Sequence, residues 1–297
     1  MNREILVTGG RGLVAQKVID KLRGDMVLTP SHAEFDITKR DSIETYLDGH
    51  PNITNVVHLA AYTDVGEPQT NLKARELCYL VNFEGTSKLF EAINARSPGR
   101  VHFVCASTDM IYPGSPDNPG PYDEFSIPIN HPLLNHYGRS KLFAEAFVRE
   151  NYPNSAIVRF GNPVTSEDRK RDDYLSTFVK IYNKNNFLYP VFADQFITLA
   201  DIDVIALTIK SLVETRKNGI YQVGSEVITP YEIVEIMLRT MGIEYQIERG
   251  SVKAYLEKIN DHTRYPVLGG LISNVQKKLG IPEPTTMQLI EKLYGKK

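Results

Sequence analysis

The chain has few cysteines, no excess of charge of one sign and no long apolar run, and each lack excludes a class of protein. Two cysteines among 297 residues exclude a disulfide framework and favour a reducing compartment, the cytoplasm. Lys and Arg total 34 against 36 Asp and Glu, a balance that argues against nucleic-acid binding. No apolar run approaches the roughly 18 residues of a membrane helix, and the start, MNREILVTGG, lacks the features of a signal peptide. The histidines and cysteines show no metal-ligand spacing, so we also expect no metal site.

Short apolar segments alternate with segments of helical periodicity over the first two-thirds of the chain. We expect strands at 5–7, 26–28, 55–59, 101–105 and 156–160, and helices at 13–22, 41–47, 72–95 and 137–150. Further helices are expected at 174–183, 201–215 and 230–241, with a strand at 219–223. This alternation is typical of an α/β fold with a doubly wound parallel sheet. The proline-rich segment 112–132 is expected to be a functional loop.

Gly9, Gly12 and Ala15 recur at intervals of three directly after the first expected strand. Glycine permits a tight turn and lets the backbone approach a pyrophosphate, while the N-terminus of the next helix offers free N–H groups. The spacing alone is weak evidence. Its position between a first strand and a helix indicates a dinucleotide-binding site.

The end of the second expected strand reads VLTPSH and lacks the acid that commonly binds the ribose 2′-hydroxyl of NAD. Arg11, inside the glycine loop, could pair instead with the 2′-phosphate of NADP. We therefore favour NADP(H) over NAD(H). Asp36 comes too late in the chain for the ribose, and we expect it either to meet the adenine amine or to begin a turn.

Tyr137 and Lys141 stand four residues apart at the start of an expected helix, so their side chains share one face. A neighbouring ammonium favours the phenolate and lowers the pKa of a tyrosine, which makes the phenol a proton donor and acceptor near neutral pH. Ser107 and Thr108 follow the fourth expected strand, at the sheet edge where ligands bind in such folds. Either hydroxyl could hydrogen-bond a substrate oxygen.

These motifs resemble those of the extended short-chain dehydrogenase/reductases, and most of all their dTDP-4-dehydrorhamnose reductase branch. TGGRGLVA resembles TGxxGxxG, HLAAYTDV resembles NAAAYT, STDMIYPG resembles STDYVFDG, and YGRSKLFAE resembles YGxSKLxGE. Asn82 matches the asparagine of VNxxGT, RFGNPV is similar to RxxNPxG of related epimerases, and FITLADID stands where the branch has PTYAxDLA. The similarity covers nearly the whole chain.

Met110 is the main departure from related enzymes. Related dehydratases have a glutamate at this position, and enzymes similar to GDP-fucose synthase have a cysteine. A methionine cannot act as an acid or base, so the resemblance implies hydride transfer without dehydration or exchange of a ring proton.

The resemblance implies a Rossmann-like doubly wound parallel sheet with a small interleaved, mainly C-terminal substrate domain. Residues 1–165 would form the nucleotide-binding unit, with 191–225 returning to it, and 166–190 and 226–297 would form the substrate-binding lobe. The implied activity is NADP-dependent reduction of the 4-keto group of a nucleotide-diphosphate-linked 6-deoxy sugar, with a homodimer as a candidate assembly. Two alternatives stay open: a nucleotide-sugar epimerase of the same family, and a cofactor-binding regulatory subunit resembling the methionine adenosyltransferase beta subunit.

The resemblance also implies residue roles. Tyr137 would donate a proton, Lys141 would hold the ribose hydroxyls and lower the Tyr137 pKa, and Thr108 would hydrogen-bond the same substrate oxygen. Cofactor contacts are expected from Tyr137, Lys141, Gly9, Gly10, Arg11, Gly12, Leu13, Val14, Asp36, Ile37, Leu59, Ala60, Ala61, Tyr62 and Val164, the last at the nicotinamide amide. Substrate contacts are expected from Ser107, Asn162 and Thr198.

Overall fold

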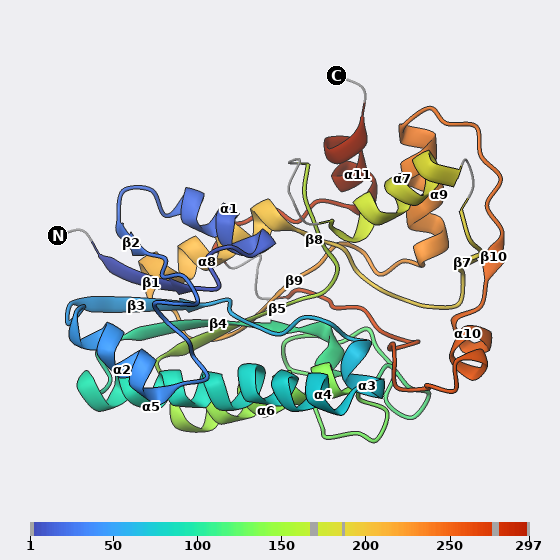
Figure 1. The fold of residues 1–297 in the computed structure, drawn as a ribbon. Coiled ribbons are helices and arrows are strands. Elements are labelled where there is room, and N and C mark those ends of the chain that lie inside the picture. The colour runs from blue at the N-terminus through green and yellow to red at the C-terminus, as the bar shows by residue number, and fades with distance from the viewer. Residues whose placement is uncertain (1–2, 167–171, 186–187, 275–278, 296–297) are drawn as a thin grey trace.

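A six-stranded parallel sheet forms the centre of the computed structural model, which describes residues 3–166, 172–185, 188–274 and 279–295 (Figure 1). The strands lie in the order β2 (Met26–Leu28), β1 (Glu4–Thr8), β3 (Ile53–His58), β4 (His102–Thr108), β5 (Ser155–Phe160) and β9 (Gly219–Val223). The central strands are buried on both faces, because helices cover each side. The predicted doubly wound sheet is confirmed.

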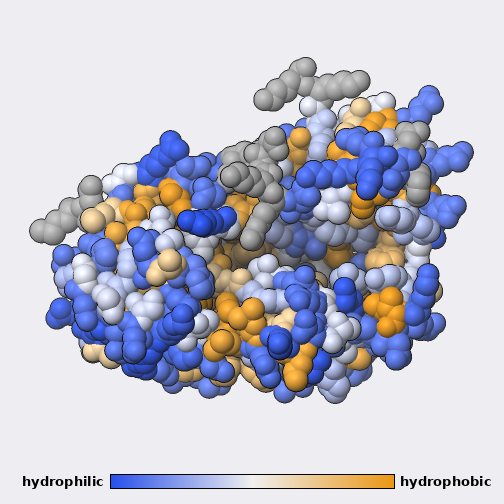
Figure 2. All heavy atoms as spheres, in the orientation of Figure 1, coloured by the Kyte–Doolittle hydropathy of each residue, from blue (hydrophilic) through white to orange (hydrophobic). Residues whose placement is uncertain are grey.

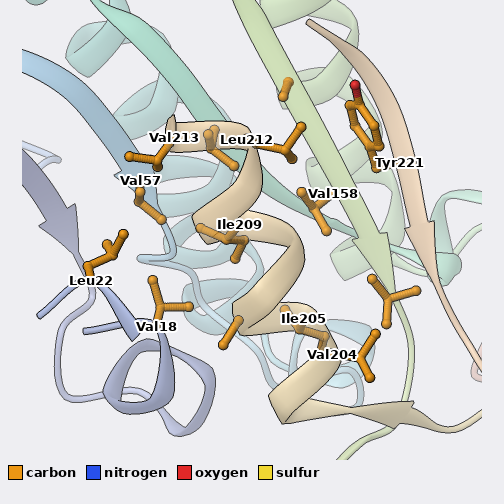
Figure 3. Close-up of a cluster of buried hydrophobic side chains, with 14 of the residues drawn as sticks. Val18, Leu22, Val57, Val158, Val204, Ile205, Ile209, Leu212, Val213 and Tyr221 are labelled. Carbon is orange, nitrogen blue, oxygen red and sulfur yellow. The ribbon is translucent and has the colours of Figure 1, made fainter. Parts of the chain in front are cut away.

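Two groups of helices cover the sheet, one on each face (Figure 1). Helices α1 (Leu13–Lys21) and α8 (Ile202–Thr215) pack on one face, and α2 (Arg40–Asp48), α5 (Thr86–Arg96) and α6 (His136–Asn151) on the other. On the first face, Val18 and Leu22 of α1 share one cluster with Ile205 and Ile209 of α8 and with Val57 of β3 (Figure 3). Residues from distant parts of the chain therefore share one core.

The structure has a helical segment at 72–95, as predicted, but a π-helical turn interrupts it. Helix α4 (Leu72–Tyr79) continues through a π-helical turn (Leu80–Gly85) into α5, and the short α3 (Glu67–Thr70) precedes it. Asn82 lies in the π-helical turn, fully buried, and its side chain bonds the backbone of Tyr62 and the hydroxyl of Ser140. Such turns often occur at functional sites.

A second hydrophobic cluster lies beyond the sheet, in the part of Figure 1 that holds α7, α9 and α11. We call this part the second lobe. It comprises α7 (Tyr174–Asn185), β7 (Val191–Phe192), α9 (Pro230–Thr240), β10 (Arg249–Gly250), α10 (Val252–Lys258) and α11 (Thr286–Tyr294), of which α7, β7, α9 and α11 contribute to the cluster. The short strands β6 (Pro163–Val164) and β8 (Ala200–Asp201) pair where the chain passes between the two parts. Thr229 caps α9 through a capping box with Glu232, and Pro230 occupies the first turn of the helix.

The boundary between the two parts lies near residue 200. Val191, Ile197 and Leu199 pack in the second cluster, whereas Ile202 and Ile205 join the core of the sheet. We therefore propose that the chain returns to the nucleotide-binding unit at about residue 200, and not at 191.

The strand order reverses between β1 and β3, because the chain passes from β1 outward to β2 and then crosses to β3 on the other side. In open α/β sheets, ligands bind in the crevice at the carboxyl ends of the strands at this switch point. No helix within the described residues is long and apolar enough to cross a membrane.

Candidate functional site

A cavity of about 860 Å³ lies at this switch point. Figure 2 shows the surface hollowed between the sheet and the second lobe. The cavity brings together most of the residues predicted from the sequence: Gly9, Gly10, Arg11, Gly12, Leu13, Val14, Asp36, Ile37, Leu59, Ala60, Ala61, Tyr62, Ser107, Thr108, Tyr137, Lys141 and Asn162.

The glycine loop forms a cradle that a side chain would fill. Gly9 has φ +69°, and a Cβ there would lie 2.7 Å from the backbone nitrogen of Ala60. The N–H of Gly12 donates to the carbonyl of Gly9 at 2.8 Å, and Gly12 directly precedes α1. The first N–H groups of α1 therefore face an open crevice, which suits the pyrophosphate of a dinucleotide. The exposed guanidinium of Arg11 lines the same cavity.

A buried network fixes the segment opposite the cradle. The Thr8 hydroxyl accepts from the N–H groups of Leu59 and Ala60 at 3.2 Å and contacts Nδ1 of His58 at 2.8 Å. Nε2 of His58 lies 2.9 Å from the Thr86 hydroxyl, which itself donates to the carbonyl of Asn82. That arrangement places the imidazole proton on Nε2 and leaves Nδ1 as an acceptor. Burial lowers the pKa of His58 to about 3, so the ring is neutral.

Helix α6 presents Tyr137 and Lys141 to the cavity. Asn135 caps the helix, and its side-chain oxygen accepts from the N–H of Gly138. A Cβ at Gly138 would lie 2.0 Å from the carbonyl of Met110, so only glycine lets the helix pack this closely behind the active face. The Lys141 ammonium is buried and donates to the carbonyl of Ala106 at 2.8 Å.

The electrostatics of Tyr137 differ from the prediction. Burial raises the pKa of Tyr137, the negative charge of Asp109 adds to the effect, and a hydrogen bond with Thr108 offsets part of it. Burial also lowers the pKa of Lys141. The spacing of Tyr137 and Lys141 predicts a lowered tyrosine pKa, but in the free protein desolvation outweighs the nearby ammonium. The phenol is therefore protonated at neutral pH.

Asp109 is a site residue that motif reading passed over. It follows β4 in a 3₁₀ turn, and its Oδ1 accepts from the Thr108 hydroxyl at 3.1 Å. Its carboxyl lies against Gly161, where a Cβ would be 2.2 Å away. Burial raises the pKa of Asp109. The sequence could have indicated Asp109, because this residue directly follows Thr108 at the end of a predicted strand.

A second cavity, of about 580 Å³, adjoins the first, because Asp109, Met110, Asn162 and Tyr174 line both. Its other walls are mainly apolar and aromatic, from the second lobe: Phe178, Ile181, Leu188, Tyr189, Val191, Phe192, Phe196, Ile197 and Tyr265. Phe196 and Ile197 lie in the FITLADID segment, but no motif indicated the other residues, since they are scattered along the chain.

Arg264 brings a cation into the second cavity. Its guanidinium packs over Gly66, where a Cβ would lie 2.1 Å away. Its Nε is buried, and among the described residues no hydrogen-bond partner is found for it. Arg264 therefore places a positive charge at the wall of the second cavity.

Two expected contacts lie away from the cavities. The side chain of Val164 is fully buried in the core of the second lobe, and Val164 lines neither cavity. Thr198 is also fully buried, and its hydroxyl accepts from the N–H of Leu271 at 3.4 Å. Neither residue lines a cavity, and the two predicted ligand contacts stay predictions.

Three other predicted residues line the cavity with their polar groups already engaged. Ser107 donates to the buried Glu145 at 2.8 Å. Asn162 donates to the carbonyl of Thr198 at 3.1 Å. Asp36 accepts from the N–H and hydroxyl of Thr38 at 3.0 and 2.7 Å, so it begins a turn, one of its two expected roles.

The switch-point crevice, the glycine cradle and the Tyr-Lys helix define a dinucleotide-binding oxidoreductase. The family model described as "RmlD substrate binding domain" matches residues 2–268, and the chain belongs to this family, within the extended short-chain dehydrogenase/reductases. The resemblance read from the motifs is confirmed at the level of the family.

Relatives and solved structures agree with this assignment. A protein of Haloferax volcanii named "Probable low-salt glycan biosynthesis reductase Agl14" is 28% identical over 293 residues, covering 94% of this chain and 93% of that protein. A dTDP-4-dehydrorhamnose reductase of Mycolicibacterium smegmatis is 31% identical over 163 residues, 54% of this chain and 45% of the relative. The crystal structure of dTDP-4-dehydrorhamnose reductase from Bacillus anthracis in complex with NADP has a TM-score of 0.84 over 99% of both chains, at 21% identity. That likeness confirms the fold.

Proposed function

We propose that this chain reduces the 4-keto group of a nucleotide-diphosphate-linked 6-deoxy sugar with NADP(H), in preference to NAD(H). The observation that carries the proposal is the junction of the two cavities. Asp109 and Met110 line both cavities there, and Thr108 and Tyr137 line the first cavity, which holds the glycine cradle. A cofactor in the first cavity and a sugar nucleotide in the second would meet at these side chains.

The second cavity suits one end of a sugar nucleotide. Aromatic side chains such as Phe178, Phe192 and Tyr265 offer faces for a nucleobase or a sugar ring. The Arg264 guanidinium offers paired N–H donors to a diphosphate, a geometry that phosphate oxygens accept well. We assign Arg264 to the diphosphate on this chemistry.

The chain's own residues supply the proton and its placement. When bound, the nicotinamide cofactor supplies the hydride that reduces the carbonyl carbon. Tyr137 gives its phenolic proton to the carbonyl oxygen, which becomes the new hydroxyl. Because burial raises the pKa of Tyr137, the phenol keeps this proton until the oxygen takes it. Thr108, whose hydroxyl donates to Asp109 in the free protein, would turn this one donor to the same oxygen. Lys141, with one of its three donors on Ala106, would hold the ribose hydroxyls with the others.

Met110 favours simple reduction over chemistry at the neighbouring ring carbons. It lines both cavities, and its thioether accepts from the Asn135 amide at 3.6 Å. A thioether carries no exchangeable proton, so Met110 can neither remove a ring proton nor return one. This observation supports the reductase over the dehydratase chemistry of related enzymes.

The preference for NADP(H) rests on Arg11. Its guanidinium is exposed in the glycine loop and lines the cofactor cavity, where it can pair with a 2′-phosphate. The similar structure from Bacillus anthracis was solved in complex with NADP, which is compatible with this preference.

The test is NADPH oxidation across a panel of dTDP-, GDP-, CDP- and UDP-linked 4-keto-6-deoxy sugars. We expect turnover with one nucleotide class, and Tyr137→Phe to lower kcat by at least about 10²-fold, since the proton donor is lost. Tyr152→Phe is the matched control, because Tyr152 is buried at the far end of the same helix and lines neither cavity. Near-native turnover of Tyr137→Phe would refute the mechanism. Cofactor binding without turnover on any sugar would point to the regulatory alternative.

A further inference from the structure

A buried ion pair joins β4, β5 and α6 next to the catalytic residues. Arg159 of β5 is fully buried, and its Nε and Nη2 donate to the two carboxylate oxygens of Glu145 on α6, at 3.1 Å for Nε. The hydroxyl of Ser107 donates to the same carboxylate at 2.8 Å. Because Ser107 directly precedes Thr108, the ion pair fixes the end of β4 that carries the catalytic hydroxyl.

The third nitrogen of Arg159 binds Tyr112, which follows the 3₁₀ turn Asp109–Ile111. Nη1 donates to the Tyr112 hydroxyl at 2.7 Å, and the guanidinium lies over the tyrosine ring, 5.5 Å from its centroid. The hydroxyl in turn donates to the carbonyl of Ser126 at 2.8 Å, in the proline-rich loop 112–132. A continuous chain of hydrogen bonds therefore runs from the end of β4 to this loop.

The same loop supports the wall of the second cavity. The N–H of Gly120 donates to the carbonyl of Leu268 at 2.7 Å, and the N–H of Tyr122 donates to the carbonyl of Gly270, which lines the cavity, at 2.9 Å. The rings of Tyr112 and Tyr122 stack, with centroids 3.9 Å apart and an angle of 5° between their planes. Tyr112 thus contacts the loop through both its ring and its hydroxyl, where the catalytic strand meets the support of this wall.

The distance between that wall and the proton donor matters for the reaction. Thr108 and Tyr137 line the first cavity, and a sugar nucleotide in the second must bring its keto group to them. A misplacement of about 1 Å can lower the rate of such a step by about 10²-fold. A hydroxyl that bonds a fixed group on each side sets this distance closely, because hydrogen bonds weaken steeply outside a narrow range of lengths and angles.

We propose that Tyr112 is a positioning residue, whose hydroxyl holds the wall of the second cavity in register with Thr108 and Tyr137. The inference rests on the proposed function for the place of the sugar nucleotide and for the reaction. Tyr112 lines neither cavity, so it acts through its two partners, Arg159 on the side of the strand and Ser126 on the side of the loop.

Tyr112→Phe keeps the ring and its stacking but removes the hydroxyl, so Arg159 and Ser126 each lose a partner. We expect kcat/KM for the sugar nucleotide to fall about tenfold, with a lower kcat as well as a higher KM, because the keto group is misplaced. The Kd of NADPH, measured by fluorescence titration, should stay within about twofold of native, since the first cavity keeps its walls. The nucleoside diphosphates dTDP, GDP, CDP and UDP probe the second cavity without turnover. The one that the native chain binds most tightly should bind Tyr112→Phe severalfold more weakly in a calorimetric titration with NADP⁺ present.

Tyr122→Phe is the matched control. The Tyr122 hydroxyl also has two partners, since it accepts from the N–H of Gly114 at 3.0 Å and donates to the carbonyl of Asn118, but both belong to the loop itself. Each variant loses one buried hydroxyl, so the two melting temperatures should fall by similar amounts. A merely structural role of Tyr112 predicts equal kinetics in the two variants, whereas positioning predicts a fall in kcat in Tyr112→Phe alone.

Native kcat/KM and native binding of the nucleoside diphosphate in Tyr112→Phe overturn the proposal, and so does an equal loss in Tyr122→Phe. A native chain that reduces no sugar refutes the proposed reductase. The titration then decides the role of Tyr112, because weaker binding of the diphosphate in Tyr112→Phe alone supports it and equal binding overturns it. A native chain that also binds none of the four diphosphates overturns both proposals.

Discussion

His58 is the buried side chain whose protonation we expect to weaken the folded state most clearly. Its ring is fully buried and neutral between two threonine hydroxyls, and burial lowers its pKa to about 3, from 6.5. Because the unfolded chain binds the proton more tightly, this contribution to stability is complete above about pH 6.5 and is lost as the pH falls toward 3. The whole difference corresponds to about 5 kcal/mol at most.

We therefore expect the free energy of unfolding to fall between pH 6.5 and 4, and His58→Gln to flatten that slope. Urea unfolding at a series of pH values measures it. The control is His262→Gln, since His262 is exposed in the second lobe. Equal slopes in the native chain and in His58→Gln would show that other groups cause the acid sensitivity.

The N-terminus of α6 connects the second lobe to the catalytic tyrosine. The side-chain oxygen of Asn135 caps the helix that carries Tyr137, while its amide donates to the carbonyl of Arg264 at 3.2 Å. Asn135, which caps α6, thus also holds the loop that carries Arg264, the residue proposed to bind the diphosphate. Gln69 strengthens this junction, since it accepts from the N–H of His136 and donates to the hydroxyl of Thr263.

Asn135→Asp separates the two roles, because the carboxylate can cap the helix but cannot donate to Arg264. We expect it to raise the KM for the sugar nucleotide severalfold, with the Kd of NADPH and the melting temperature close to native. Asn135→Ala removes the cap as well and should lower the stability by about 1 kcal/mol in addition. A native KM in Asn135→Asp would show that the bond to Arg264 does not position the loop.

The elements that could be predicted from the sequence are those that depend on the local sequence pattern. Strands β1 to β5, the glycine turn and the capped helix α9 each depend on local pattern, and the cradle and the Tyr137 face follow from them. The π-helical turn did not follow, because the buried bonds of Asn82 to Tyr62 and Ser140 are made across the fold. Likewise, the full burial of Thr198 depends on packing within the second lobe.

Arg264 shows the same limit within the site. It reaches the second cavity only because its loop crosses to Gly66 and Asn135. Its position carries no motif, so only the structure shows that these distant parts of the chain meet.

At the scale of the whole molecule, the nucleotide-binding unit is not continuous in sequence. Helix α8 and strand β9 come after the first pass through the second lobe, yet α8 covers one face of the sheet with Ile205, Ile209, Leu212 and Val213 (Figure 3). A chain ending at residue 165 would leave that face of β3, β4 and β5 open to water. Burying a single large aliphatic side chain contributes about 1.5–3 kcal/mol, so losing four such side chains removes a free energy comparable with the whole stability of a typical domain, about 5–15 kcal/mol.

We therefore expect a fragment of residues 1–165 to show no cooperative thermal transition and to bind NADPH at least about 10²-fold more weakly than the full chain, although it contains the whole glycine cradle and Tyr137. Circular dichroism melting and the fluorescence titration measure the two effects. Because α8 and β9 complete the sheet before α9 begins the rest of the second lobe, the full chain should melt in one transition, with both parts contributing. A fragment that melts cooperatively and binds NADPH with native affinity would show that the face under α8 is dispensable, and that the cofactor site and the lobe are independent units.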